Sequence, residues 1–277
     1  MLPLLALASS AVWGTSDFFA GLKARTMAPP AVVALTQGAA LVALSAILLV
    51  RHTGFSPSFS GNGPLWSIAA GVAGAAGLVC FYTALASGTM GVVAPISSLG
   101  ALVPVFLGLL TGEEPSVTAW VGMAVAVAGA ALASGPELTG ALPARPVVLA
   151  AVAAAFFGMA LFCLDRGARF ALLETLWTMR LTSVALFVVA GLMARSVGGA
   201  RVHDLPALTV IGLGDVTANA LFAFSSSRGM VSVASVLGSL YPVATVFWAR
   251  LILGERLRRI QAVGVVMTLV GVVAIAV

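Results

Sequence analysis

The stretch that decides the fold is GEEPSVTAWVGMAVAVAG (residues 112–129), because it returns 142 positions later as GERLRRIQAVGVVMTLVG (residues 254–271). In both copies a Gly-Glu pair is followed by glycines 10 and 17 positions after the first glycine. Each copy lies in the last part of one half of the 277-residue chain. An internal duplication in so apolar a chain indicates a membrane protein built from two related halves, a common plan for transporters.

The composition excludes an ordinary soluble domain. Apolar residues make up 61% of the chain and charged residues 8%, whereas soluble domains carry roughly 25% charged residues. Residues 53–112 contain no Asp, Glu, Lys or Arg. A water-soluble domain of this size cannot bury that much apolar surface, so the chain is expected to lie in lipid.

Ten apolar runs are long enough to cross a hydrocarbon core about 30 Å thick, which needs roughly 20 helical residues. The first half offers Pro3–Gly21, Ala31–Val50, Pro64–Ala86, Met90–Thr111 and Ser116–Ser134, and the second offers Pro146–Leu164, Ala171–Ala194, Leu205–Ser225, Met230–Leu253 and Ile260–Ala276. The alternating pattern of β-barrel strands is absent. Because unpaired backbone groups are not tolerated in lipid, the sequence predicts an all-α integral membrane fold with ten transmembrane helices.

Five helices in each copy is an odd number, so the second copy must begin on the opposite side of the membrane. The sequence therefore predicts two inverted five-helix repeats, residues 1–135 and 146–277. Trp13-Gly14 matches Phe157-Gly158 in this pairing. The segment 99–104, LGALVP, also matches 237–242, LGSLYP, although this pair is offset by 138 positions, about one helical turn out of step.

At this point the residues resemble a known family. The segment 12–19 (VWGTSDFF), the segment 94–97 (APIS), Leu240-Tyr241-Pro242 and the two Gly-Glu copies resemble the EamA branch of the drug/metabolite transporter superfamily over nearly the whole chain. The resemblance implies a ten-helix inverted-repeat fold around a central cavity, in the bacterial cytoplasmic (inner) membrane. It also implies export of a metabolite, such as an amino acid, or of a drug.

Two features of the sequence differ from what the resemblance implies. The small four-helix relatives carry a membrane Glu three residues before a Gly-Thr-Thr, and here Ala11 and Ala155 take that place, so their carboxylate proton exchange does not carry over. The family orientation has both termini in the cytoplasm. It would leave four arginines in cytoplasmic connections (Arg51, Arg166, Arg169, Arg228) and nine basic residues opposite (Lys23, Arg25, Arg145, Arg195, Arg201, Arg250, Arg256, Arg258, Arg259), against the positive-inside rule.

Two charged residues inside predicted spans, Arg180 and Asp215, are the strongest candidates for a substrate-binding site. Arg180 is costly in a lipid core, by at least about 2.5–3.5 kcal/mol, unless it faces a cavity or a partner. Its guanidinium could bind a substrate carboxylate, pair with an acid, or reach toward the membrane surface. Asp215 lies four residues before Asn219 and so shares a helix face with it, and that face continues to Phe222. It could line the cavity or form a bridge to Arg180.

Further polar and aromatic residues complete the predicted cavity. Asp17 could face the cavity or lie at the level of the lipid headgroups. Trp13 could supply an apolar wall with one hydrogen-bond donor, its indole N–H. The whole predicted lining is Trp13, Asp17, Gln37, Tyr82, Ser97, Trp177, Arg180, Asp215, Asn219, Phe222 and Tyr241. Gln37 and Tyr82 could equally serve as interhelical hydrogen-bonding groups. Proline near Ser97 and next to Tyr241 permits helix bending.

The glycines of the two duplicated segments are predicted to act in helix packing. Gly122 and Gly129, like Gly264 and Gly271, lie two turns apart, and such stripes let helices approach closely. These four glycines are predicted to pack the two halves together without contacting substrate. Glu113 and Glu255 are expected to complement the dipoles of the helices that follow them, with a contact to an arginine as the alternative.

The function that follows is a secondary transporter for a small metabolite, an amino acid or similar amphipathic compound, working outward by alternating access as a monomer. The alternatives are a multidrug or cationic compound exporter of the same fold, and a channel. Neither an ATP-binding loop, nor a metal or cofactor site, nor a clustered nucleophile and base is present, so an enzyme is disfavoured. The expected partners are the lipid bilayer, a small-molecule substrate and a proton or another coupling ion, and not nucleic acid.

Overall fold

The computed structural model describes residues 2–51, 59–110, 116–118, 120–122, 124–125, 128–129, 132, 144–195, 198–255 and 259–275. Every secondary-structure element with bounds in these residues is a helix. The elements are α1 (Leu2–Lys23), α2 (Pro29–Arg51), α3 (Gly63–Ser87), α4 (Met90–Ser98), η1 (Leu99–Ala101), α5 (Leu102–Leu110), α7 (Arg145–Ala168), α8 (Leu172–Ala194), η2 (Val202–Asp204), α9 (Leu205–Arg228), α10 (Val231–Gly238), α11 (Pro242–Leu253) and α12 (Arg259–Ile275).

The bundle is long and apolar enough to cross a membrane, which confirms the predicted all-α membrane fold. Seven helical stretches in the described residues qualify as spans: Pro29–Arg51, Gly63–Ser87, Met90–Leu107, Arg145–Ala168, Leu172–Met193, Val202–Arg228 and Val231–Leu253. A shorter apolar helix covers Ala262–Gly271. Ten spans stay a prediction, since α1 is not among these stretches and 8 of the 19 residues of Ser116–Ser134 lie outside the described residues.

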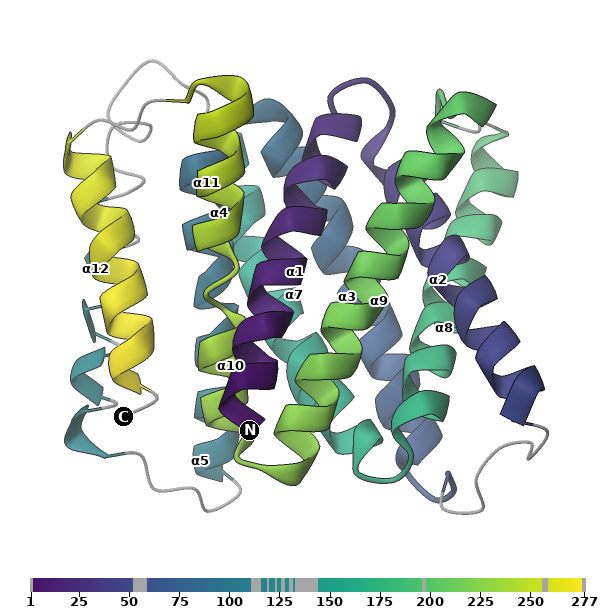
Figure 1. Ribbon diagram of the computed structural model, residues 1–277, viewed down its shortest axis with the longest axis horizontal. Helices are drawn as coiled ribbons and strands as arrows, with labels where there is room; N and C mark the ends of the chain where they lie inside the picture. The colour runs from purple at the N-terminus through teal and green to yellow at the C-terminus, as the bar shows by residue number, and fades with distance from the viewer. Residues whose placement is uncertain are drawn as a thin grey trace.

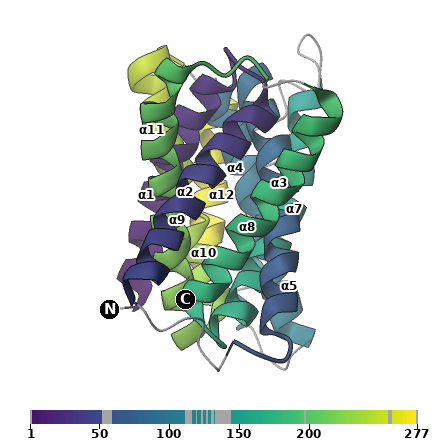
Figure 2. The same cartoon turned by 90° about the vertical axis from the view of Figure 1, so that its right-hand side faces the viewer.

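The helices lie side by side along one direction, with the start of α1 and the end of α12 at the same end of the bundle (Figures 1 and 2). The Ser225 hydroxyl donates to the Leu2 carbonyl at one end (2.8 Å), and Lys23 Nζ lies 2.6 Å from Asp204 Oδ1 at the other. These contacts make α1 and α9 antiparallel. We call the two ends the Leu2 end and the Lys23 end.

The helices α3 and α7 form a second antiparallel pair. A Cβ at Gly63 would lie 3.2 Å from Phe170, and one at Gly88 would lie 2.7 Å from Pro146. Since Gly21 packs on Leu85, α1 and α3 both finish at the Lys23 end. It follows that α1 and α7, the first helices of the two halves, run in opposite directions.

Two predicted spans are broken near the middle of the bundle. The first changes from α4 to a 3₁₀ turn at Leu99–Ala101 before α5, and the second changes from α10 to α11 through Ser239–Tyr241. Each break lies at the glycine of a Gly-x-x-x-Pro sequence: Gly100, four residues before Pro104, is inside the 3₁₀ turn, and Gly238, four residues before Pro242, is the last residue of α10. A proline cannot donate to the carbonyl four residues earlier and its ring crowds that carbonyl, which explains both positions.

Two apolar layers pack the bundle on either side of these breaks. The layer at the Lys23 end contains Phe18, Phe81, Tyr82, Leu85, Met90, Val93, Leu208, Ile211 and Tyr241 among others. The layer at the Leu2 end contains Leu44, Ala70, Cys163, Leu164, Leu176, Met179, Val216, Phe222 and Ala234 among others. The polar residues described next lie between the two layers.

A candidate substrate chamber

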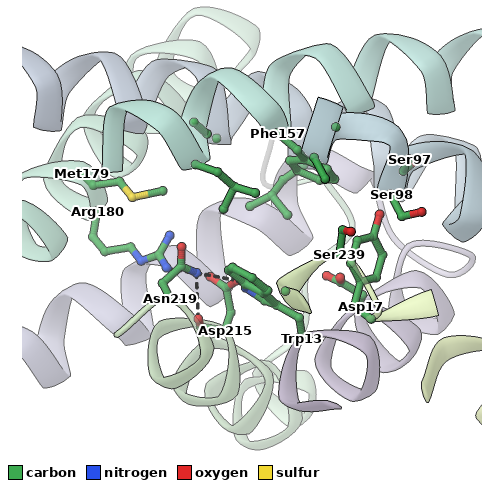
Figure 3. A pocket seen from close by; sticks show the side chains of 18 residues that line it. Trp13, Asp17, Ser97, Ser98, Phe157, Met179, Arg180, Asp215, Asn219 and Ser239 are labelled. Atoms are coloured by element: carbon green, nitrogen blue, oxygen red, sulfur yellow. Dashed lines mark hydrogen bonds and ion pairs between the residues drawn. The ribbon is translucent and has the colours of Figure 1, made fainter. Parts of the chain in front are cut away.

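A cavity of about 80 Å³ lies in the middle of the bundle, at the level of the two helix breaks (Figure 3). It is lined by Trp13, Asp17, Gly74, Leu78, Ser97, Ser98, Gly100, Ala101, Phe157, Ala160, Leu161, Met179, Arg180, Asp215, Asn219, Gly238, Ser239 and Tyr241. We call this cavity the chamber. It can hold water, but pockets for drug-sized ligands measure roughly 300–1,000 Å³, so this conformation is a narrow one.

Asp215 is the most heavily bonded side chain of the chamber. Its Oδ1 accepts hydrogen bonds from Trp13 Nε1 (3.2 Å) and from Asn219 Nδ2 (3.1 Å). Its Oδ2 accepts from Gln37 Nε2 (3.2 Å) and lies 2.9 Å from Arg180 Nη2. Four helices, α1, α2, α8 and α9, therefore meet at one carboxylate.

Arg180 is 1% exposed, so its charge is removed almost completely from solvent and lipid. Asp215 supplies the counter-charge, and Nη1 donates to Gln37 Oε1 at 2.5 Å. The Nε group makes no hydrogen bond with the described part of the chain. Because buried polar groups are normally hydrogen-bonded, this N–H group lacks the partner that such a group usually has.

Asp17 lies on the other side of the chamber from Arg180, with Trp13 between them (Figure 3). Its carboxylate is buried, at 7% exposure for the residue, and accepts one hydrogen bond, from Tyr82 Oη at 3.2 Å. Among the described residues no basic side chain pairs with Asp17. A buried carboxylate without a counter-ion is costly, so the site favours a cationic group or a proton.

Aromatic rings form the walls between these polar groups. Trp13 from α1 and Phe157 from α7, which match in the duplicated sequence, both line the chamber. The ring of Phe81 lies behind, with its centroid 5.4 Å from that of Phe157 and 6.0 Å from that of Tyr241. The Tyr241 hydroxyl donates to the Ala94 carbonyl (3.3 Å), which ties α11 to α4.

Not every residue predicted for the lining reaches it. Gln37, Tyr82 and Phe222 form a layer behind the lining: Gln37 and Tyr82 bond to the two carboxylates, and the Phe222 ring lies 5.7 Å from that of Trp13. Trp177 lies outside the chamber. Its Nε1 donates to Ser45 Oγ at 2.9 Å, which joins α8 to α2.

Besides Phe157, sequence reasoning missed ten residues of the lining, namely Gly74, Leu78, Ser98, Gly100, Ala101, Ala160, Leu161, Met179, Gly238 and Ser239. Small and aliphatic residues fill most of a membrane chain, and no signal separates those that face a cavity from those that face lipid. Phe157 could have been found, because its partner Trp13 was already a candidate.

The four glycines of the duplicated copies are all buried. A Cβ on Gly129 would lie 2.7 Å from the Gly264 carbonyl and closer still to the Thr268 nitrogen, so the backbones touch there. None of the four lines the chamber.

Glu255 makes a contact that the sequence does not predict. Its expected role beside the following helix stays a prediction, because residues 256–258 lie outside the described residues. Its carboxylate accepts hydrogen bonds from Met90 N (3.3 Å) and Gly91 N (3.1 Å) at the start of α4. The alternative we named, contact with an arginine, is present at longer range: Arg25 Nη2 lies 3.7 Å away. Glu113 lies outside the described residues.

The fold is that of an integral membrane protein, and the family that the chain matches is one of transporters. The chain matches the EamA-like transporter family over residues 2–135 and again over residues 144–277. The protein therefore belongs to the EamA-like transporter family, within the drug/metabolite transporter superfamily.

Similarity to solved structures supports the same fold. One structure, described only as the crystal structure of a protein, shares 18% sequence identity over 99% of this chain and 94% of that chain, with a TM-score of 0.75. At this identity the likeness establishes the fold alone. No curated protein matches the chain.

Proposed function

We propose that the protein is a secondary transporter that exports a small zwitterionic metabolite, such as an amino acid, across the bacterial cytoplasmic membrane by alternating access. The observation that carries this proposal is the pair of buried polar sites in one chamber. Arg180 offers an unsatisfied N–H group on one side, and Asp17 offers a carboxylate without a counter-ion on the other.

The proposed ligand geometry follows from these two sites. The ammonium group binds Asp17 and the carboxylate binds the free Nε of Arg180. An Arg guanidinium suits carboxylates because its N–H groups diverge in a planar fork. The aromatic walls of Trp13, Phe157 and Tyr241 would contact the apolar part of the ligand.

We further propose that the two halves are inverted repeats. Their first helices, α1 and α7, run in opposite directions. Gly14 of α1 packs on the Tyr241 carbonyl at one helix break, and Gly158 of α7 packs on the Gly100 carbonyl at the other. Because Gly14 and Gly158 also match in sequence, these contacts support a two-fold relation between the halves.

Alternating access is supported by the narrowness of the chamber. A cavity of about 80 Å³ between two apolar layers is too small for a metabolite, so the surrounding helices must move apart before one can bind. Breaks in α4–α5 and in α10–α11 at the chamber level give each half a place to bend. Binding sites at discontinuous helices near the midplane are typical of secondary transporters.

The proposal is tested with purified protein in liposomes. Flux of labelled amino acids and of cationic dyes is measured across a concentration series, with and without a pH gradient. We expect saturable flux of at least one amino acid, and we expect Arg180→Ala to abolish it. The matched control is Arg250→Ala, which removes an exposed arginine from α11.

Two results would overturn the assignment. Saturable flux that survives Arg180→Ala in folded protein would exclude the guanidinium as the ligand anchor. Flux that rises linearly with concentration would indicate a channel.

A second function, export of organic cations, is favoured by the charge of the chamber. Two carboxylates, Asp17 and Asp215, line it together with one guanidinium. Saturable flux of a cationic dye without flux of any amino acid would establish this function instead.

A further inference from the structure

The second copy of the Gly-Glu signature lies outside the lining of the chamber, yet it makes a specific contact between the two halves. Gly254 ends α11 in the left-handed conformation, with φ of 64°. This turn carries Glu255 away from the axis of α11 and toward α4. Both carboxylate oxygens are used there, one on Met90 N and one on Gly91 N.

The start of α4 depends on this carboxylate. The preceding residue, Thr89, makes no side-chain capping bond, and α4 is buried from Met90 through Ser98. The first N–H groups of a helix have no partner inside the helix, so a buried helix start needs an outside acceptor. Glu255, whose side chain is 16% exposed, supplies it and also complements the helix dipole.

The other end of α4 reaches the chamber. Ser97 and Ser98 line it directly, followed by Gly100 and Ala101 of the break. The helix has 9 residues, about 13 Å at 1.5 Å per residue, so one short element joins the Glu255 contact to the chamber wall.

We infer that Glu255 is a positioning residue that holds the Lys23 end of the chamber closed by capping α4 across the two halves. The inference rests on the proposed alternating-access function. When α4 and α11 separate to open this end, the two carboxylate hydrogen bonds must break. Their strength therefore sets how often the chamber opens toward the Lys23 end.

Chemical accessibility tests this without any substrate. Ser97→Cys is placed in a Cys80→Ala, Cys163→Ala background and labelled with a membrane-impermeant maleimide from each face of the membrane. An Arg250→Cys reference, near the end of α11, shows which preparation exposes the Lys23 end. We expect Glu255→Gln, which keeps the size but loses the charge, to raise labelling of Ser97→Cys from the Lys23 end about tenfold. That factor corresponds to about 1.4 kcal/mol in the opening equilibrium.

Two comparisons make the result specific. Asp204→Asn breaks the Lys23–Asp204 pair at the same end and leaves α4 capped, so labelling is expected to change less than twofold. If Glu255→Gln does not yield monodisperse protein, Glu255→Asp, one methylene shorter, is expected to raise labelling about threefold.

Unchanged labelling in Glu255→Gln, or an equal rise in Asp204→Asn, would overturn the inference. So would unchanged labelling in a folded Glu255→Asp protein. Failure of the proposed function would appear differently, as absence of saturable flux in the parent protein.

Discussion

Asp17 and Asp215 are two carboxylates of one chamber in very different surroundings. Asp215 meets Trp13, Gln37, Asn219 and Arg180 and joins four helices. Asp17, in the part of the chain that the structure describes, meets only the hydroxyl of Tyr82. The difference teaches that burial alone does not identify a ligand site. A saturated carboxylate holds the bundle together, whereas an unsaturated one has capacity left for a ligand.

Among the variants considered, Asp215→Ala should lower the stability of the protein most, because it leaves Arg180 buried without a counter-ion. Removing one partner of a buried ion pair costs about 3–5 kcal/mol. We expect a strong fall in the thermal unfolding temperature in detergent, together with loss of flux.

The double variant Asp215→Ala with Arg180→Met sharpens this comparison. It removes the whole pair, so stability should recover to a large extent while flux stays absent. Saturable flux in the double variant would show that the pair serves packing only.

Asp17→Asn should weaken substrate binding without lowering the stability of the folded protein. The amide keeps an acceptor for Tyr82 and removes a buried charge, so we expect the unfolding temperature to stay equal or to rise. The KM for an amine-bearing substrate should increase about tenfold, equivalent to about 1.4 kcal/mol of lost binding. The KM for its N-acetylated analogue, which has no cationic group, should not change; an equal rise for both compounds would contradict a role in binding the ammonium group.

Among these variants, Tyr82→Phe should change substrate binding least. It removes a single hydrogen bond from Asp17, worth about 0.5–1.5 kcal/mol, and keeps the aromatic packing. We expect the KM to change between twofold and tenfold at unchanged maximal flux. A change larger than that of Asp17→Asn would show that the hydroxyl contacts the ligand itself.

The apolar runs and their breakers predicted the helices well, because lipid forces each backbone group into a helix and leaves the run length as the signal. Met90–Thr111 and Met230–Leu253 were each treated as one span, although prolines in both permitted bending. The breaks lie at Gly100 and just after Gly238, and these glycines are four residues before Pro104 and Pro242. The repeated Gly-x-x-x-Pro spacing could have located them.

The polar part of the site was also visible in the sequence, since Arg180 and Asp215 are costly in lipid unless they are paired or face a cavity. The sequence did not reveal where the Trp177 side chain lies. An indole inside a membrane span can line a cavity or donate an interhelical hydrogen bond equally well. The partner of Glu255 was hidden for a different reason. It caps a helix that begins 165 positions earlier, and no local pattern carries such a contact.

The contacts of Gly14 and Gly158 set how closely the two halves approach each other at the depth of the chamber. Each glycine lies against a backbone carbonyl of the other half, with Ala244 and Val103 as the nearest side chains. A methyl group added at either glycine would overlap that carbonyl, so the helices would have to separate to accept it. The absence of a side chain at these two positions therefore limits both the width of the chamber and the ease with which the halves tilt.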